Sequence, residues 1–136
     1  MPAIVTFVGK SGSGKTTLIE AAVRELKKKG FRVAVVKHAH HGFEMDRPGK
    51  DSWRFAQAGS DVVTVSSPGR VATIEHVEGE LDYEQVISRI CSKIDIILVE
   101  GFKQSSKVKI DVSGTERAEE INKIVDFLIE QIHQNR

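Results

Sequence analysis

Eight residues near the start of the chain, GKSGSGKT at positions 9–16, place glycines, a lysine and a threonine in the spacing G-x-x-x-x-G-K-T. Glycines allow a loop tight enough for successive backbone N–H groups to surround phosphate oxygens. We therefore expect Gly12, Ser13 and Gly14 to bind the phosphates of a nucleotide. From average residue frequencies, the pattern arises by chance in about one chain in 200 of this length, and its position between a strand and a helix lowers that figure further.

The residues after this loop complete the pattern of a P-loop. A helix that begins near Lys15 directs its dipole and its first N–H groups at the same anion. Lys15 is expected to contact the β- and γ-phosphates, and Thr16 to ligate Mg²⁺ through its hydroxyl oxygen. Thr17 is expected to approach the α-phosphate.

A P-loop needs a second acidic anchor, usually at the C-terminal end of a neighbouring parallel strand. The apolar run IDIILVEGF at positions 94–102 supplies Glu100, and Gly101 lets the backbone turn away over the site. Asp95 begins the same run, about 16 Å away if the strand is extended, and is expected at the opposite edge of the sheet. We assign Glu100 to the catalytic site. Its carboxylate would contact a Mg²⁺-bound water or polarise the attacking water. The alternative is an exposed carboxylate at a strand end.

A third stretch, VVKHAHHGFEMDRPGKDS at positions 35–52, holds His38, His40, His41, Lys50 and Asp51. If its leading strand runs parallel to the first strand, as a right-handed crossover predicts, the loop follows at the phosphate edge. We favour a phosphate-responsive segment whose side chains contact the γ-phosphate, Mg²⁺ or a second anionic ligand. A zinc site and a solvated loop without a role remain alternatives; structural zinc usually takes four ligands.

The elements that must position these residues alternate between strands and helices along the chain. Short β-branched runs predict strands, and segments with apolar residues at helical spacing predict amphipathic helices. Strands are expected at 3–9, 32–38, 61–67, 70–76, 94–101 and 107–113, and helices at 15–30, 50–60, 82–93 and 117–134. This order predicts an α/β, P-loop NTPase-like three-layer fold with a mainly parallel central sheet, with an antiparallel hairpin at the Pro-Gly turn between 67 and 70.

Composition narrows the class of protein. A chain of 136 residues predicts a single nucleotide-binding domain over residues 1–136. Its 20 Lys+Arg against 19 Asp+Glu give no basic excess for nucleic acid or an anionic membrane. The single cysteine, Cys91, cannot form an internal disulfide, and no apolar run is long enough to span a bilayer. We expect a cytoplasmic protein.

Three stretches together resemble the MobB family of molybdopterin-guanine dinucleotide biosynthesis adapter proteins. They are GKSGSGKTT near the N-terminus, VVKHAHHGFEMDRPGKDSWRFAQAGSD in the middle and ILVEGFK near position 100, and the resemblance covers about residues 3–112. It implies a GTP-binding P-loop protein with weak hydrolysis, a homodimer, and an adapter for the MobA-type guanylyltransferase that joins GMP to molybdopterin. It assigns phosphate binding to residues 12–17 and adds Lys103, in the VEGFK motif, to the second-ligand residues. On the same grounds Lys10 resembles an interface lysine of some dimeric relatives, although an exposed solvated lysine explains it equally well.

The chain departs from the family pattern after this motif. Only about fifteen residues, QSSKVKIDVSGTERA, precede the last helix, and the guanine-reading motif N-K-x-D is absent from the sequence. Binding of a nucleotide with Mg²⁺ is therefore predicted from the residues, whereas the choice of GTP is implied by the resemblance. Asp111 is the one acid nominated for base contacts.

A second function of another class remains open: a small ATP-dependent phosphotransferase with residues 38–52 as a lid over its acceptor. A kinase lid is normally rich in arginine. Arginines here are few and scattered, which favours the adapter.

Overall fold

The computed structural model describes residues 1–10, 12, 14–39, 42–43, 45–90, 93–102, 107–112 and 118–136. These residues divide into two compact units, one formed by Met1–His38 with Tyr83–Arg136 and the other by Ala39–Asp82. The expectation of a single domain over residues 1–136 stays a prediction. No helix in the described ranges is long and apolar enough to cross a membrane.

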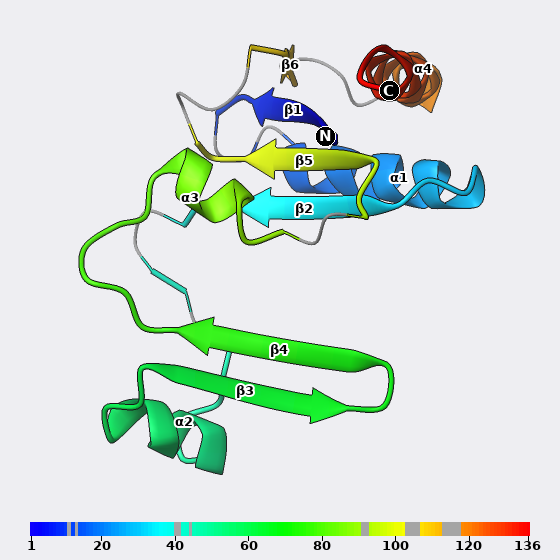
Figure 1. The fold of residues 1–136 in the computed structure, drawn as a ribbon. Helices are drawn as coiled ribbons and strands as arrows, with labels where there is room; N and C mark the ends of the chain where they lie inside the picture. The colour runs from blue at the N-terminus through cyan, green and yellow to red at the C-terminus, as the bar shows by residue number, and fades with distance from the viewer. Residues whose placement is uncertain are drawn as a thin grey trace. The chain divides into compact units, whose positions relative to one another are not determined.

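The first unit is built on a parallel sheet of four strands in the order β2-β5-β1-β6 (Figure 1). Its strands are β1 (Ala3–Val8), β2 (Val33–Lys37), β5 (Ile96–Glu100) and β6 (Lys109–Asp111). β1 and β5 are almost wholly buried and rich in Val, Ile and Leu, as a strand covered on both faces requires. The predicted edge strand at 107–113 is confirmed as β6.

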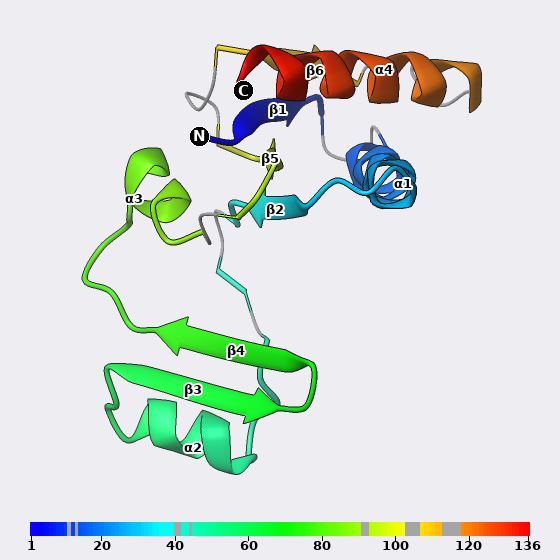
Figure 2. The same ribbon diagram turned by 45° about the vertical axis from the view of Figure 1, so that its right-hand side comes forward.

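Helices cover both faces of this sheet, as the view turned by 45° shows (Figure 2). On one face, α1 (Lys15–Lys28) and α4 (Ala118–Gln134) bury an apolar stripe against β1 and β5, with Leu26 and Leu128 fully enclosed. On the other face, α3 (Tyr83–Ile87) packs against Val36 and Val99. The predicted three-layer fold with a mainly parallel sheet is therefore confirmed.

Helix α3 is shorter than the predicted helix at 82–93. The Ser88 amide still donates to Glu84, but the amides of Arg89 and Ile90 donate to carbonyls three residues back. The Ser88 hydroxyl and the Arg89 guanidinium also donate to the carbonyl of Gln85. These local side-chain bonds compete with the helical ladder, so the helix tightens and ends.

The second unit holds α2 (Asp51–Gln57) and an antiparallel pair, β3 (Val62–Ser67) and β4 (Arg70–Glu75). The predicted hairpin is confirmed, and its strands form a two-stranded sheet of their own rather than joining the parallel one. Gly69 takes a φ of 81° in the turn, a conformation that glycine adopts at no steric cost.

Candidate functional site

Two glycines between β1 and α1 take the backbone conformation that a phosphate-binding loop needs. Gly12 and Gly14 take φ values of 80° and 88°, in the left-handed region that side chains disfavour. Gly14 caps α1, and the first helical bond of this terminus runs from the Leu18 amide to the Gly14 carbonyl at 3.0 Å. Because a glycine cap has no side-chain acceptor, the amides of residues 15–17 are the donors that an anion at this terminus would bind. Ser13, also predicted to bind phosphate, lies outside the described residues.

Strand register brings the predicted acid to this loop. β1, β5 and β2 are parallel, and Glu100 at the end of β5 lies opposite Phe7 on one side and Lys37 on the other. The C-terminal ends of the three strands therefore meet at one edge of the sheet, where open α/β sheets bind their ligands. β5 lies between β1 and β2, so the two strands joined by α1 are parallel without being neighbours.

Lys15 and Glu100 face each other at this edge. The Lys15 ammonium donates to the carbonyl of Gly9 at 2.9 Å and lies 3.9 Å from Glu100 Oε1. Both side chains are about one-sixth exposed, at 17% each. A mostly buried ammonium that lies beyond hydrogen-bond distance of its carboxylate is suited to bind a phosphate oxygen instead.

Thr16 and Glu100, the two predicted Mg²⁺ ligands, line the same hollow of about 370 Å³ beside α1. A hydroxyl oxygen and a carboxylate oxygen are ligands that Mg²⁺ prefers, and the opening leaves room for the waters that this ion keeps. Thr16 and Glu100 are thus of the residue types that could hold Mg²⁺, and the ion would neutralise phosphate charge. The hollow is lined by Thr16, Ile19, Glu20, Val23, Arg24, Val35, Lys37 and Glu100.

Most of the residues that line this hollow were not predicted from the sequence. Val35 lies within an apolar run that reads as buried, yet its side chain is 50% exposed because β2 is an edge strand. Strand order decides this exposure, and a single sequence gives no direct signal of it.

The structure gives a steric reason for glycine at position 101, which was not predicted from the sequence. Its φ is 101°, and a Cβ at this position would lie 2.7 Å from the carbonyl oxygen of His38. The His38 amide donates to the Glu100 carbonyl at 2.9 Å, so the pairing of β2 with β5 continues to the point of closest approach. A side chain at position 101 would push the ends of β2 and β5 apart. The glycine directly after Glu100 was the feature of the sequence that could have predicted this close approach.

Two rings pack on the residue after this glycine. The His38 ring stacks on Phe102 with centroids 4.4 Å apart, and the Tyr83 ring meets Phe102 edge-on at 5.8 Å. Burial raises the pKa of the Tyr83 phenol, and the charge of Glu84 adds to that shift. His38 is thus placed beside the end of β5 in this structure.

The other residues of the histidine stretch are placed only in part. Lys50 and Asp51 are exposed at the start of α2, and the Asp51 carboxylate accepts from the Ser52 amide at 2.7 Å. The Ser52 hydroxyl donates to Asp46 at 2.9 Å, so this part of the stretch is ordered by its own contacts.

His40, His41 and Lys103 lie outside the described residues. No group of three potential metal-ligating side chains occurs among the residues that are described. The zinc alternative involves His40 and His41 and so stays untested, as does the response of this loop to phosphate.

Comparison with known proteins matches residues 4–130 to the family described as MobB, molybdopterin guanine dinucleotide synthesis protein B. This chain belongs to the MobB family. The resemblance of the three sequence motifs to that family is thereby confirmed.

Two relatives match most of this chain and are themselves longer. The molybdopterin-guanine dinucleotide biosynthesis adapter protein of Haemophilus influenzae is 35% identical over 127 residues, which are 93% of this chain and 71% of the relative. The Escherichia coli protein of the same name is 41% identical over 110 residues, 79% of this chain and 63% of the relative.

A crystal structure of molybdopterin-guanine biosynthesis protein B has 28% sequence identity and a TM-score of 0.76. The match covers 96% of this chain and 99% of the solved one. The two chains therefore share the same fold over nearly their full extent.

Proposed function

We propose that this member of the MobB family is a GTP-binding adapter of molybdopterin-guanine dinucleotide biosynthesis. In that role it binds GTP with Mg²⁺ through residues 12–17 and Glu100, hydrolyses it weakly, and assists a MobA-type guanylyltransferase in the cytoplasm. One observation carries the nucleotide-binding part: Lys15 and Glu100 oppose each other beside Thr16, where the parallel strands end. The adapter role comes from the family and from the names of its relatives.

The second unit supports the proposed homodimer. Six of its large apolar side chains are at least half exposed: Phe43, Met45, Phe55, Val62, Val65 and Val71. Soluble monomers seldom expose many large apolar groups in so short a segment, and a second copy of the chain is the occupant that a homodimer provides. Light scattering should give twice the mass of 15.1 kDa, and Val65→Lys together with Val71→Lys should shift it to the monomer.

Calorimetric titration tests the nucleotide directly. GTP and ATP would each be added to the purified chain, with Mg²⁺ and with EDTA. We expect GTP to bind with Mg²⁺ at least tenfold more tightly than ATP, and to weaken in EDTA because Thr16 and Glu100 then lose the ion they share. Preference for ATP would favour the phosphotransferase, and absence of binding by either nucleotide would overturn the proposal.

A further inference from the structure

Phe102 follows Glu100 by two residues and contacts two rings that are far apart in the sequence. The His38 ring lies nearly parallel to it, at an interplanar angle of 29° and a centroid distance of 4.4 Å. The Tyr83 ring approaches edge-on, at 64° and 5.8 Å. Both geometries are favourable for aromatic pairs, so Phe102 is held from two sides.

His38 and Tyr83 are the two residues at which the first unit connects to the second. The chain leaves the first unit after His38 and returns to it at Tyr83, with Ala39–Asp82 between them. Both connections therefore meet on one ring. That ring belongs to the same short segment as the acid of the proposed nucleotide site.

The backbone ties this ring closely to Glu100. The Glu100 carbonyl accepts from the His38 amide at 2.9 Å, and Gly101 passes so close to His38 that a Cβ there would lie 2.7 Å from its carbonyl oxygen. Because of this close approach, the end of β5 has little room to move independently of the end of β2. A shift of Glu100 toward a metal or a phosphate must therefore move Phe102, or strain its contacts with His38.

We propose that Phe102 is a positioning residue through which the occupied nucleotide site and the segment 39–82 influence each other. The inference rests on the proposed function, because a nucleotide at Lys15 and Glu100 is the ligand that moves the end of β5. The Lys15–Glu100 ion pair at 3.9 Å must rearrange when Lys15 turns to a phosphate, and the shift passes to His38 and Tyr83 through the stacked rings. By thermodynamic linkage, a partner bound to residues 39–82 then changes nucleotide affinity by the same factor.

A purely structural role for Phe102 predicts a different result. Phe102 packs beside the core cluster of Val36, Ile97 and Val99, so its truncation costs stability in either case. Only the coupling role predicts that the effect of nucleotide on residues 39–82 is lost while nucleotide still binds.

Hydrogen exchange of the full chain with and without Mg-GTP separates the two roles. We expect nucleotide to change amide exchange within residues 39–82 of the wild-type chain. In Phe102→Leu, which keeps an apolar side chain but loses the ring, that change should fall at least fivefold while GTP affinity shifts less than threefold. Phe127→Leu is the matched control, because Phe127 packs against the other core cluster and should keep the full change.

The outcomes of these experiments distinguish failure of the inference from failure of the proposed function. If GTP binds but exchange in 39–82 stays constant in the wild-type chain, or if Phe102→Leu retains the whole change, the inference is overturned while the proposed function stands. If calorimetry detects no GTP binding at all, both are overturned. Should Phe102→Leu fail to fold, Tyr83→Leu, which removes one of the two ring contacts, must reduce the change, and full retention there would also overturn the inference.

Discussion

Two acids at opposite ends of the β5 segment have opposite surroundings. Asp95 lies directly before Ile96, at the N-terminal edge of the sheet, and Glu100 closes the strand at the C-terminal edge. Asp95 accepts from the Arg32 amide at 2.7 Å and from the Arg136 guanidinium at 3.2 Å. Glu100 faces the Lys15 ammonium at 3.9 Å, which is beyond hydrogen-bond distance.

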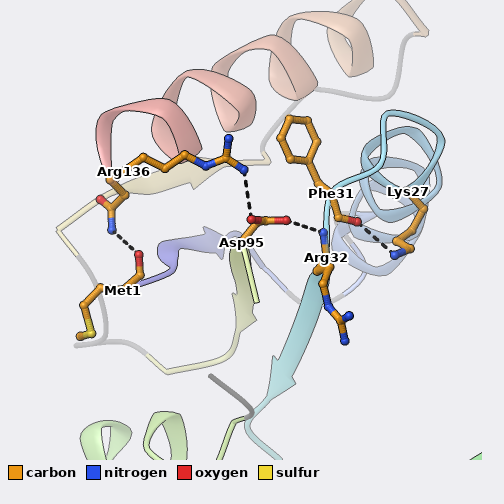
Figure 3. Close-up of polar contacts among 7 residues, drawn as sticks. Met1, Lys27, Phe31, Arg32, Asp95 and Arg136 are labelled. Atoms are coloured by element: carbon orange, nitrogen blue, oxygen red, sulfur yellow. Dashed lines mark hydrogen bonds and ion pairs between the residues drawn. The ribbon is translucent and has the colours of Figure 1, made fainter. Parts of the chain in front are cut away.

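Asp95 lies in a polar cluster at the N-terminal edge of the sheet (Figure 3). The Arg136 guanidinium also lies 6.0 Å from the Phe31 ring centroid, and the Lys27 ammonium donates to the Phe31 carbonyl. The side chain of Asn135 donates to the carbonyls of Met1 and Pro2. These contacts join the end of α4 to the beginnings of β1, β2 and β5.

Asp95 therefore stabilises the fold, whereas Glu100 belongs to the proposed nucleotide site. The hydrogen bonds of Asp95 tie it to the Arg32 backbone and to Arg136, which follows α4. Among the described residues Glu100 forms one long ion pair, and it lines a hollow of about 370 Å³, so a ligand can replace its partner. We therefore expect substitutions at the two ends of β5 to affect different measurements.

Glu100→Gln should have the largest effect, on turnover. We expect the isolated wild-type chain to hydrolyse GTP slowly, below about one turnover per minute, as small GTPases do without an activator. The substitution should lower that rate by about a hundredfold and binding by much less, because the lost charge acts in the transition state. Phosphate release measured beside calorimetry separates the two. Wild-type turnover in Glu100→Gln would remove this residue from catalysis, and turnover of many per second by the unmodified chain would contradict the adapter role.

Lys15→Ala should have the second-largest effect. It should reduce Mg-GTP affinity at least tenfold because a charge-assisted phosphate contact is lost. Lys28→Ala is the matched control, since Lys28 lies at the other end of α1 and pairs with Glu25 at 3.2 Å. Calorimetry on both variants gives the comparison. Equal affinities for the two variants would remove the loop before α1 from the account.

Asp95→Asn should lower stability without changing nucleotide affinity. The loss should be about 1 kcal/mol, the difference between charge-assisted and neutral hydrogen bonds. The pKa of Asp95 is held below its usual value by the bond from the Arg32 amide and then by Arg136, with burial acting in the opposite direction. Since the folded pKa is lowered, this stability is present above the ordinary aspartate pKa and is lost as pH falls through the folded value.

Urea unfolding of wild type and Asp95→Asn across pH 2 to 7 measures this dependence. The two curves should differ at pH 7 and converge at the acid end. A constant gap over the whole range would show that the Asp95 charge is not the stabilising feature.

Arg136→Ala should have the smallest effect, a loss of about 0.5 kcal/mol, because its side chain is 58% exposed and water screens the ion pair. Thermal unfolding in low and high salt checks it. The variant should be less stable than wild type in low salt, and the difference should shrink as salt rises. A loss as large as that of Asp95→Asn would mean that the last residue, rather than the Arg32 amide, is the main partner of Asp95.

Much of this arrangement was predictable from local sequence patterns. The glycine-lysine-threonine spacing predicts the loop before α1, and an acid closing the most apolar run predicts Glu100 at the sheet edge. The position of Asp95 at the opposite edge is confirmed as well. These predictions succeed because a strand of known direction fixes which of its ends each residue occupies.

The remaining features depend on contacts between distant segments. The stacking of His38 on Phe102 follows from strand order, which places the ends of β2 and β5 side by side, and the edge-on contact of Tyr83 adds a third distant segment. The cluster around Asp95 requires Arg136, which follows α4, to reach Asp95 just before β5, a separation of 41 positions. No periodicity or motif in the sequence reports such pairings.

Nuclear magnetic resonance of the ¹⁵N-labelled chain, titrated with Mg-GTP, tests the central claim most directly. We expect the largest amide shifts at Gly12, residues 14–17 and residues 100–102, while Asp95 and Arg136 at the opposite edge stay nearly constant. Large shifts around Asp95 with little change at Gly14 and Lys15 would place the nucleotide elsewhere and contradict the division of β5 into a structural end and a functional end.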